Sequence, residues 1–283
     1  MLKVLKAGLY TSIQDLGRCG FMKYGVPISG AMDQYAATKA NLLLNNKPNF
    51  AVIECTQIGP KLLFNQATQI AVCGANMTAK INQHKVSLNS LINIEVGDIL
   101  NFGALIYGYR TYIAVKGGFE TEQILESNSY YQPITNNNIL VKDDEIAYKA
   151  YASITEKSNS AIAVNVKHFS NQVIQAHKGP EFDLLDKEQQ DFLLSANFHI
   201  AINNRMAYQL KEQLANSLPS ILTSAILPGT VQLTPLGKII ILMRDAQTTG
   251  GYPRILNLPE NSINTLSQKK LGDVVKFVVK PLR

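Results

Sequence analysis

A dense polar corner follows an apolar run near the C-terminus. The stretch "RDAQTTGGYPRI" (residues 244–255) comes directly after "IIILM", which has the composition of a buried strand. Its side chains offer a carboxylate, an amide, hydroxyls and a phenol, and two adjacent glycines remove bulk: Asp245, Gln247, Thr248, Thr249, Gly250, Gly251 and Tyr252. Such a group of donors and acceptors suits recognition of a small planar amide or ureido compound. The alternative is a plain β-turn in which Asp245 caps its own backbone.

A second polar stretch lies near the N-terminus, within "TSIQDLGRCGFMKYGVPISGAMD" (residues 11–33). Gln14, Asp15 and Arg18 stand close together there, and glycines on both sides of the arginine permit close approach of a ligand to the backbone. The planar guanidinium of Arg18 could hold a carboxylate or phosphate, and Asp15 could hold that arginine or accept a proton. The alternative is an Asp15–Arg18 ion pair that pins a loop, and the residues alone leave both open.

Three further polar residues are candidates for substrate binding. Asp33 falls in the first turn of an expected helix, where the helix dipole favours an anion. Arg205, in "NNRMAYQL", follows an expected strand, although a surface arginine is the common case. Glu54 interrupts the apolar run "AVIECTQIGP". It either faces solvent on a half-exposed strand or is a buried acid, in which burial favours the protonated form.

The elements that must position these residues are mostly strands. Short segments rich in Val and Ile, bounded by Gly, Asn or Pro, predict strands at residues 68–75, 111–118, 161–169, 199–204, 237–243 and 273–280. Helical signals are fewer, and they predict helices within residues 29–48, 186–197 and 260–268. The sequence therefore predicts a mainly β fold with a few helices.

Two pairs of similar segments indicate two lobes of similar construction. "IGPKLLF" (58–64) resembles "KGPEFDLL" (178–185), and "EVGDILNF" (95–102) resembles "KLGDVVKF" (270–277). Each predicts a tight glycine-containing turn that leads into a strand. Together with the length of 283 residues, these pairs favour two β-rich lobes rather than one large unit.

The boundary between the lobes is expected in the polar segment "YASITEKSNSA" (151–161). The lobes would then comprise residues 1–155 and 156–283. A second polar segment of low charge, "ESNSYYQPITNNN" (126–138), predicts a surface loop.

Composition argues against several classes of function. The net charge is +6, but no basic run is interleaved with aromatic residues, so nucleic-acid binding is not expected. Cys19, Cys55 and Cys73 are widely separated, which is typical of a reduced compartment, and the histidines lack the spacing of metal ligands, so no metal is expected. No apolar run approaches the ~20 residues that span a membrane, and no signal peptide is apparent, so a soluble cytoplasmic protein is predicted.

Five blocks of the sequence resemble one known family. In order they read "GLYTSIQDLGRCGFMKYGVPISGAMDQYAATKANLLLNN", "ECTQIGPKLLF", "NRMAYQL", "MRDAQTTGGYPRI" and "LSQKKLGDVVKF". Over almost its whole length, the chain is similar to the family known as the C subunit of 5-oxoprolinase, as allophanate hydrolase subunit 2 or as biotin-dependent carboxyltransferase. The resemblance implies two cyclophilin-like β-barrel lobes.

The resemblance also implies a choice of functions. The first is a hydrolase component, inactive alone, that works with the A and B subunits of an ATP-dependent 5-oxoprolinase to open 5-oxo-L-proline to L-glutamate. ATP would bind at the level of the complex. The second is half of a carboxyltransferase acting on urea or a similar amide, with biotin supplied in trans because no biotinyl-lysine segment is present. The third is a regulatory binding protein that antagonises a kinase inhibitor.

Under the first two functions, the resemblance and the chemistry suggest roles for the polar residues. Each substrate presents an N–C=O group that must be polarised, which Asp245, Gln247 and Thr248 could bind while Arg18 or Arg205 neutralises developing negative charge. The catalytic candidates are Asp245, Gln247, Arg18 and Asp15. The substrate-binding candidates are Thr248, Thr249, Gly250, Gly251, Tyr252, Gln14, Asp33, Glu54 and Arg205.

The chain departs from the family pattern at two places. Ala207 stands where relatives usually have glycine, and "ILESNSYY" replaces a turn that typically carries an arginine between serines. If that arginine contacts substrate in relatives, the substrate of this chain differs from theirs.

Overall fold

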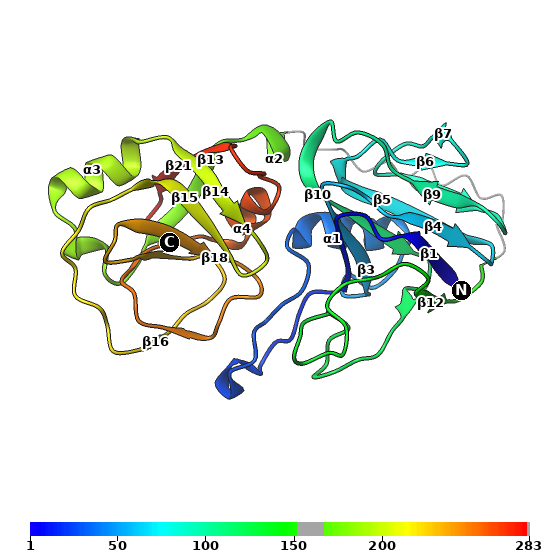
Figure 1. Cartoon of the computed structure of the whole chain (residues 1–283), viewed down its shortest axis with the longest axis horizontal. Coiled ribbons are helices and arrows are strands. Elements are labelled where there is room, and N and C mark those ends of the chain that lie inside the picture. The colour runs from blue at the N-terminus through cyan, green and yellow to red at the C-terminus, as the bar shows by residue number, and fades with distance from the viewer. Residues whose placement is uncertain (152–166, 282–283) are drawn as a thin grey trace. The chain divides into compact units, whose positions relative to one another are not determined.

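The computed structural model describes residues 1–151 and 167–281, and the chain folds into two compact units (Figure 1). Unit 1 comprises Met1–Arg18 and, among the described residues, Ser29–Tyr151. Unit 2 comprises Cys19–Ile28 and the chain from Lys167 onward. The division predicted between residues 155 and 156 lies outside the described residues and stays a prediction.

The described part of unit 1 contains two sheets and one α-helix. In the seven-stranded sheet the order is β11 (Phe119–Glu120), β12 (Glu145–Tyr148), β1 (Leu2–Lys6), β4 (Lys61–Phe64), β9 (Ile99–Asn101), β6 (Lys80–Ile81) and β7 (His84–Lys85). In the five-stranded sheet the order is β2 (Tyr10–Gln14), β3 (Val52–Thr56), β10 (Tyr107–Val115), β5 (Thr68–Asn76) and β8 (Leu91–Ile94). The sheets therefore bring together segments that lie far apart in the sequence.

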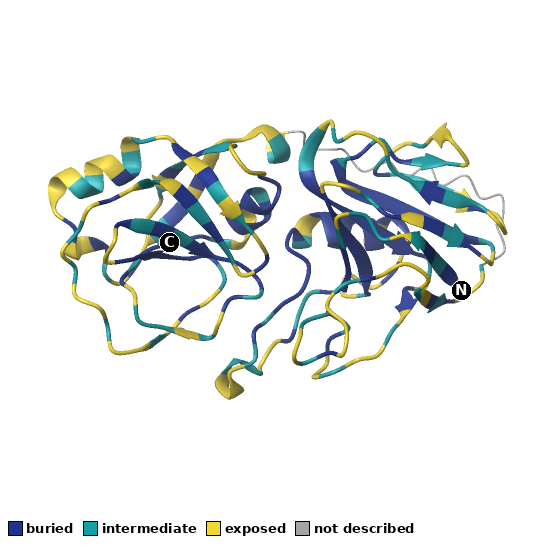
Figure 2. Cartoon of the chain, viewed as in Figure 1, coloured by how far each residue is buried: buried dark blue, intermediate teal, exposed yellow. Residues whose placement is uncertain are grey.

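The five-stranded sheet of unit 1 is covered on both faces. Ile113 and Val115 of β10 pack into a core shared with the seven-stranded sheet, whereas Tyr112 and Ala114 pack into a second core with α1 (Gln34–Leu43). This alternation follows from the two-residue period of a strand. It explains why β5 and β10 are buried along most of their length, and Figure 2 shows them as mainly buried ribbons.

Helix α1 begins at the polar N-terminal stretch and fixes its position. The side chain of Asp33 accepts a hydrogen bond from the Ala36 N–H at 3.1 Å, which caps the helix. Ala36 and Ala40 pack against the sheet, and the left-handed backbone of Asn45, with φ 52°, ends the helical path. The helix predicted within residues 29–48 is confirmed.

Unit 2 is built around a closed seven-stranded barrel. The strand order is β13 (Val173–Lys178), β20 (Arg254–Asn257), β17 (Thr230–Leu233), β18 (Lys238–Leu242), β15 (Ala207–Gln213), β14 (Phe198–Asn203) and β21 (Val274–Val279). A two-stranded ribbon, β16 (Ser224–Ala225) with β19 (Thr249–Gly250), accompanies it. The helices are α2 (Lys167–Ser170), α3 (Lys187–Ser195) and α4 (Glu260–Ser267), with 3₁₀ turns η1 (Met22–Tyr24) and η2 (Phe182–Leu184).

The prediction of a mainly β fold is confirmed, and the barrel of unit 2 accords with the predicted architecture. The helices predicted within 186–197 and 260–268 appear as α3 and α4. Five of the six predicted strands are found as β5, β10, β14, β18 and β21. In the parts of the chain that are described, none of the helices has the length and apolar character required to traverse a bilayer.

Three local predictions need correction. Residues 167–169 form part of α2 rather than a strand, because Asn171 N–H closes a helical turn on the Lys167 carbonyl at 2.9 Å; residues 161–166 lie outside the described ranges. The segment 178–185 leads into η2, not a strand. The predicted surface loop 126–138 includes fully buried Ser127 and Ser129, because their hydroxyl groups bind a buried carboxylate.

Candidate functional site

Asp15, at the end of β2, is the centre of a hydrogen-bond network in unit 1. Its Oδ1 accepts from the Gly17 N–H at 2.7 Å and from the hydroxyls of Ser127 and Ser129 at 2.6 Å each. Its Oδ2 accepts from the Asn128 N–H at 2.6 Å. Only 6% of Asp15 is exposed. This geometry suits an anion that ties the N-terminal stretch to residues 127–129, and a catalytic role for Asp15 stays a prediction.

Arg18 and Gln14 contact the same segment. The Arg18 side chain is fully buried, and its Nη2 donates to the carbonyl of Ser129. Gln14 is also fully buried, and its Nε2 donates to Ser12 Oγ at 3.0 Å and to the Tyr130 carbonyl at 3.3 Å. The structure therefore brings Gln14, Asp15 and Arg18 together through residues 127–130.

Glu54 is a fully buried acid, which decides between the two alternatives that the sequence left open. The strand register places it between Ser12 of β2 and Tyr112 of β10. Its Oε2 accepts from the Met32 N–H at 2.7 Å, and its Oε1 lies 3.9 Å from Arg110 Nε. A buried carboxylate with these partners anchors the backbone that leads into α1.

The phenol of Tyr112 joins Asp33 to this group. Its oxygen accepts from the Asp33 N–H at 2.7 Å. Burial raises the pKa of Tyr112 well above its usual value, and the charges of Glu54 and Asp33 add to the effect. The phenol therefore keeps its proton at neutral pH and can itself donate a hydrogen bond.

The two cysteines of unit 1 are unsuited to nucleophilic chemistry. Burial raises the pKa of Cys73 to about 12, and burial raises the pKa of the Cys55 thiol further still. Both thiols therefore stay protonated and are poor nucleophiles. Within residues 1–151 and 167–281, no three His, Cys, Asp or Glu side chains are grouped closely enough to hold a metal ion.

In unit 2, Arg205 and Asp245 form a close pair. Arg205 follows β14 and Asp245 follows β18, and the guanidinium donates from Nε to Oδ2 at 2.7 Å and from Nη2 to Oδ1 at 3.1 Å. The Asp245 N–H also donates to the Arg205 carbonyl at 2.9 Å. The side chains are 7% and 12% exposed. A carboxylate oxygen has two lone pairs, so the oriented Asp245 can still accept an N–H from a ligand.

In the polar stretch 244–255, backbone groups form the ribbon β16–β19, and some of the side chains stay accessible. Ser224 pairs with Gly250 and Ala225 with Thr249, and the Thr248 carbonyl accepts from the Ile226 N–H at 3.1 Å. The side chains of Gln247, Thr249 and Tyr252 are exposed. These three groups are therefore accessible to a ligand or a partner.

The two glycines of the corner are closely packed within unit 2. A Cβ on Gly250 would lie 2.7 Å from Gln232 Nε2, and a Cβ on Gly251 would lie 3.0 Å from the Ile221 carbonyl oxygen. The space beside the two glycines is therefore occupied by the Gln232 side chain and the Ile221 backbone. The sequence analysis had suggested that this space could admit a ligand. Their predicted role in substrate binding stays a prediction.

Arg254, which the sequence analysis missed, anchors the ribbon. Its guanidinium donates to Glu181 from Nη2 at 2.8 Å and from Nε at 3.0 Å, and its Nη1 donates to Ser224 Oγ. The Arg254 N–H donates to the same carboxylate at 2.8 Å. Arg254 therefore connects β20 of the barrel with β16, and β16 in turn holds Thr249 of β19.

The residues that sequence reasoning missed lie next to those it found. Ser127 and Ser129 bind Asp15, Tyr112 binds Asp33, and Arg254 holds the ribbon of Thr249. One signal for the serines was available, because they fall where the sequence departs from the family pattern. For Tyr112 no signal was available, because it occurs in an ordinary strand segment, whereas Arg254 lies at the end of the stretch 244–255 that the sequence analysis singled out.

Comparisons with known proteins agree on the family. A family model described as carboxyltransferase domain, subdomain A and B, matches residues 24–279. The C subunit of 5-oxoprolinase from Escherichia coli (strain K12) is 33% identical over 98% of this chain and 91% of its own length. The protein of the same name from Haemophilus influenzae is 31% identical over 98% of this chain and 90% of its own length.

Longer relatives match over part of their length. The urea amidolyase of Saccharomyces cerevisiae is 32% identical over 98% of this chain, which corresponds to 16% of that protein. Among solved structures, TTHA0988 has a TM-score of 0.87 at 24% identity, and this chain spans 55% of it. The urea amidolyase of K. lactis has a TM-score of 0.85 at 26% identity, with 18% of that chain spanned. The chain belongs to the family of carboxyltransferase domains with subdomains A and B.

Proposed function

We propose that this chain is the C subunit of an ATP-dependent 5-oxoprolinase and acts with the A and B subunits to open 5-oxo-L-proline to L-glutamate. One observation carries the proposal: two relatives that bear the name of this 5-oxoprolinase component match almost end to end, over 98% of this chain and 91% and 90% of their own lengths. In this proposal the chain is inactive alone.

The geometry of unit 2 supports a role in holding the lactam. A lactam presents one N–H and one C=O, and Asp245, oriented by two hydrogen bonds from Arg205, can accept the N–H. The exposed amide of Gln247 and hydroxyl of Thr249 can donate to the carbonyl oxygen or to the carboxylate of the substrate. ATP, bound at the level of the complex, would supply the phosphoryl group that activates the lactam oxygen.

The test is a reconstitution in which each of the three proteins is omitted in turn. Glutamate released from 5-oxoproline and ATP should fall to background without this chain. Asp245→Asn should lower kcat by about 10²–10³-fold, the cost of losing one oriented group at a reacting centre, while size-exclusion chromatography still shows the complex. Asp183→Asn, at a carboxylate that is 78% exposed, serves as the control.

One result would contradict the proposed function, and another would contradict only the role given to Asp245. If the complex forms and no glutamate appears, the 5-oxoprolinase function is wrong. If glutamate is released at the normal rate by Asp245→Asn, the function stands and this corner is not the catalytic one.

Carboxyl transfer to urea or a similar small amide is the second candidate. It is favoured by the match to the S. cerevisiae urea amidolyase, at 32% identity over 98% of this chain. The same donors and acceptors suit a urea N–H and C=O, and biotin would have to arrive on another protein. Transfer of label from carboxybiotin to urea, measured with the same three proteins, separates this activity from lactam opening.

A further inference from the structure

A row of lysines crosses the seven-stranded sheet of unit 1. In the strand register Lys6 of β1 lies opposite Lys61 of β4, Lys80 of β6 lies opposite Asn101 of β9, and Lys85 of β7 lies opposite Lys80. The pairing of β4 with β9 continues from Leu62–Leu100 and places Lys61 beside Asn101. The row therefore reads Lys6, Lys61, Asn101, Lys80 and Lys85.

All five side chains of this lysine row belong to the same, outer face of the sheet. Leu62, Leu100 and Ile81 alternate with row members along their strands and pack into the core of unit 1, so the row faces away from it. Neighbouring strands are about 4.8 Å apart, so the row is about 19 Å long. A β-bulge between Val4 and Lys6 brings Lys6 into the row, where regular pairing would have placed Leu5.

The charges of the lysine row have no acidic partners among the described residues. None of the ion pairs found there involves Lys6, Lys61, Lys80 or Lys85. Elsewhere on the same face, Lys3 lies 3.3 Å from Asp143 and opposite Glu145. Like charges placed opposite each other destabilise a sheet. The row is therefore a stretch of positive charge that a bound anion would offset.

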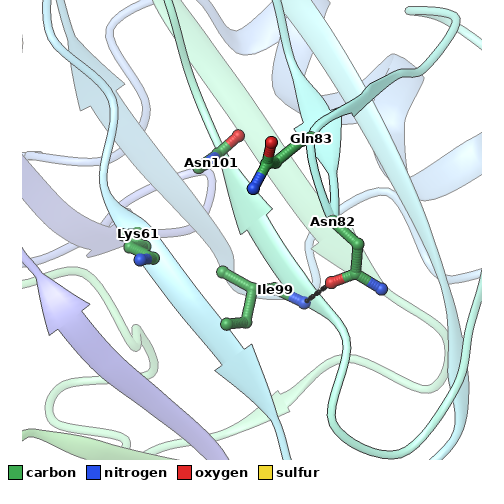
Figure 3. Close-up of a pocket in the computed structure, with 5 residues that line it drawn as sticks. All are labelled: Lys61, Asn82, Gln83, Ile99 and Asn101. Atoms are coloured by element: carbon green, nitrogen blue, oxygen red, sulfur yellow. Dashed lines mark hydrogen bonds between the residues drawn. The ribbon is translucent and has the colours of Figure 1, made fainter.

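A pocket of about 240 Å³ opens at the middle of the row (Figure 3). Lys61, Ile99 and Asn101 line it from the sheet, and Asn82 and Gln83 line it from the turn between β6 and β7. Figure 3 draws these five side chains, with the amides of Gln83 and Asn101 near each other in this view. The Oδ1 of Asn101 is buried and accepts no hydrogen bond from the described residues.

The carboxylate nearest to the pocket in sequence is already engaged. Asp98 accepts from Asn82 Nδ2 at 2.6 Å and from the Glu95 N–H at 2.8 Å, while Asn82 Oδ1 accepts from the Ile99 N–H at 2.9 Å. These contacts fix the turn that carries Gln83. The pocket thus combines one amide held by hydrogen bonds, that of Asn82, with lysines that have no ion pair among the described residues.

We propose that this pocket and the lysine row form a binding site for a small phosphate-bearing ligand that also carries an O–H or N–H donor. The ammonium groups supply charge-assisted hydrogen bonds to phosphate oxygens, and the flexible lysine stems can converge on a ligand smaller than the row. The Asn101 Oδ1 accepts the donor of the ligand. None of the residues of the polar corners in either unit takes part, so the site is independent of the proposed lactam chemistry.

Calorimetric titration of the full-length chain with inorganic pyrophosphate, protonated on one oxygen, tests the site. We expect one binding event per chain that weakens as salt is added, because the contacts are ionic. The double variant Lys61→Ser/Lys80→Ser should bind about tenfold more weakly, and Asn101→Ala should bind several-fold more weakly. Lys3→Ser removes a lysine of the same face that has an acidic partner, and it should leave affinity unchanged.

Circular dichroism and thermal unfolding must first show that all variants fold. The proposal is overturned if pyrophosphate does not bind, or if Lys3→Ser weakens binding as much as the double variant. It is also overturned if citrate binds as tightly as pyrophosphate, because the preference for phosphate is then absent. A polyglutamate peptide that binds when pyrophosphate does not would make the row a contact surface for an acidic protein segment instead.

Discussion

Asp15 stabilises the fold of unit 1 through four hydrogen bonds, and this leads to a prediction about stability. In Asp15→Asn the negative charge is lost, and one oxygen is replaced by an NH₂ group that faces donors such as Ser127 Oγ and Ser129 Oγ. Hydrogen bonds to a charged group contribute about 1.5–3 kcal/mol each, so we expect the free energy of unfolding in urea to fall by about 2–4 kcal/mol.

Asp183→Asn is the matched control, because its carboxylate is 78% exposed and pairs with Lys178 at the surface. We expect this variant to unfold at nearly the same urea concentration as the wild type. If Asp15→Asn kept full stability and the reconstituted complex lost turnover, Asp15 would be a catalytic residue and not a structural anion.

The sequence predicted which single residues are candidates for polar contacts, but it did not predict their hydrogen-bond partners. The sequence showed that both corners carry unusual functional groups, and it left open whether Glu54 is buried. The partners of Asp15 are the hydroxyls of Ser127 and Ser129, which are 112 and 114 residues away. Because strand pairing and loop path decide such contacts, spacing along the chain could not reveal them.

At the scale of elements, the Glu181–Arg254 pair makes the anchorage of the ribbon β16–β19 depend on pH. Hydrogen bonds from the Arg254 guanidinium lower the pKa of Glu181 below its ordinary value of 4.5. A lowered pKa in the folded state means that the stabilisation is complete above pH 4.5 and is lost as the pH falls through the folded-state pKa. Glu181→Gln should therefore unfold at a lower temperature than the wild type near neutral pH, and the two proteins should converge in acid.

Thermal unfolding from about pH 7 to about pH 3 measures this difference. Glu120→Gln, at an exposed acid of β11, should parallel the wild type throughout. The difference in unfolding temperature between wild type and Glu181→Gln could instead stay constant from about pH 7 to about pH 3. Hydrogen bonding that does not depend on the charge of Glu181 would then support the ribbon.

Elements with strong local signals could be predicted, and those defined by distant pairing could not. β5 is rich in Ile, Val and Ala, β18 is rich in Ile and Leu, and both have glycine nearby, so composition identifies them. The segment at 167–169 resembled a strand end, but a backbone hydrogen bond within four residues made it helical. The lysine row was invisible in the sequence, because strand register assembles it from residues 6, 61, 80 and 85.

At the scale of the whole molecule, the sequence indicated two lobes but not how the chain is shared between them. Cys19–Ile28 groups with unit 2 although the residues on both sides belong to unit 1. Nothing in its composition distinguishes this segment from an ordinary glycine-rich loop. Only the three-dimensional fold reveals that it serves the other unit.

The segment Cys19–Ile28 can be removed without stretching unit 1. Its removal therefore tests whether this segment belongs to unit 2. A Cβ on Gly30 would lie 2.8 Å from Gly17 N, and the Ala31 N–H donates to the Asp15 carbonyl at 2.8 Å, so the chain returns to where it left. With Cys19–Ile28 replaced by a short Gly-Ser linker, we expect hydrogen exchange to speed up in the barrel strands of unit 2, to which this segment belongs, and to stay unchanged in α1 and β10. The same linker in place of exposed residues 136–138 is the control and should leave the barrel protected. Faster exchange confined to α1 and β10 would mean that Cys19–Ile28 stabilises unit 1, and the division of the chain would have to be redrawn.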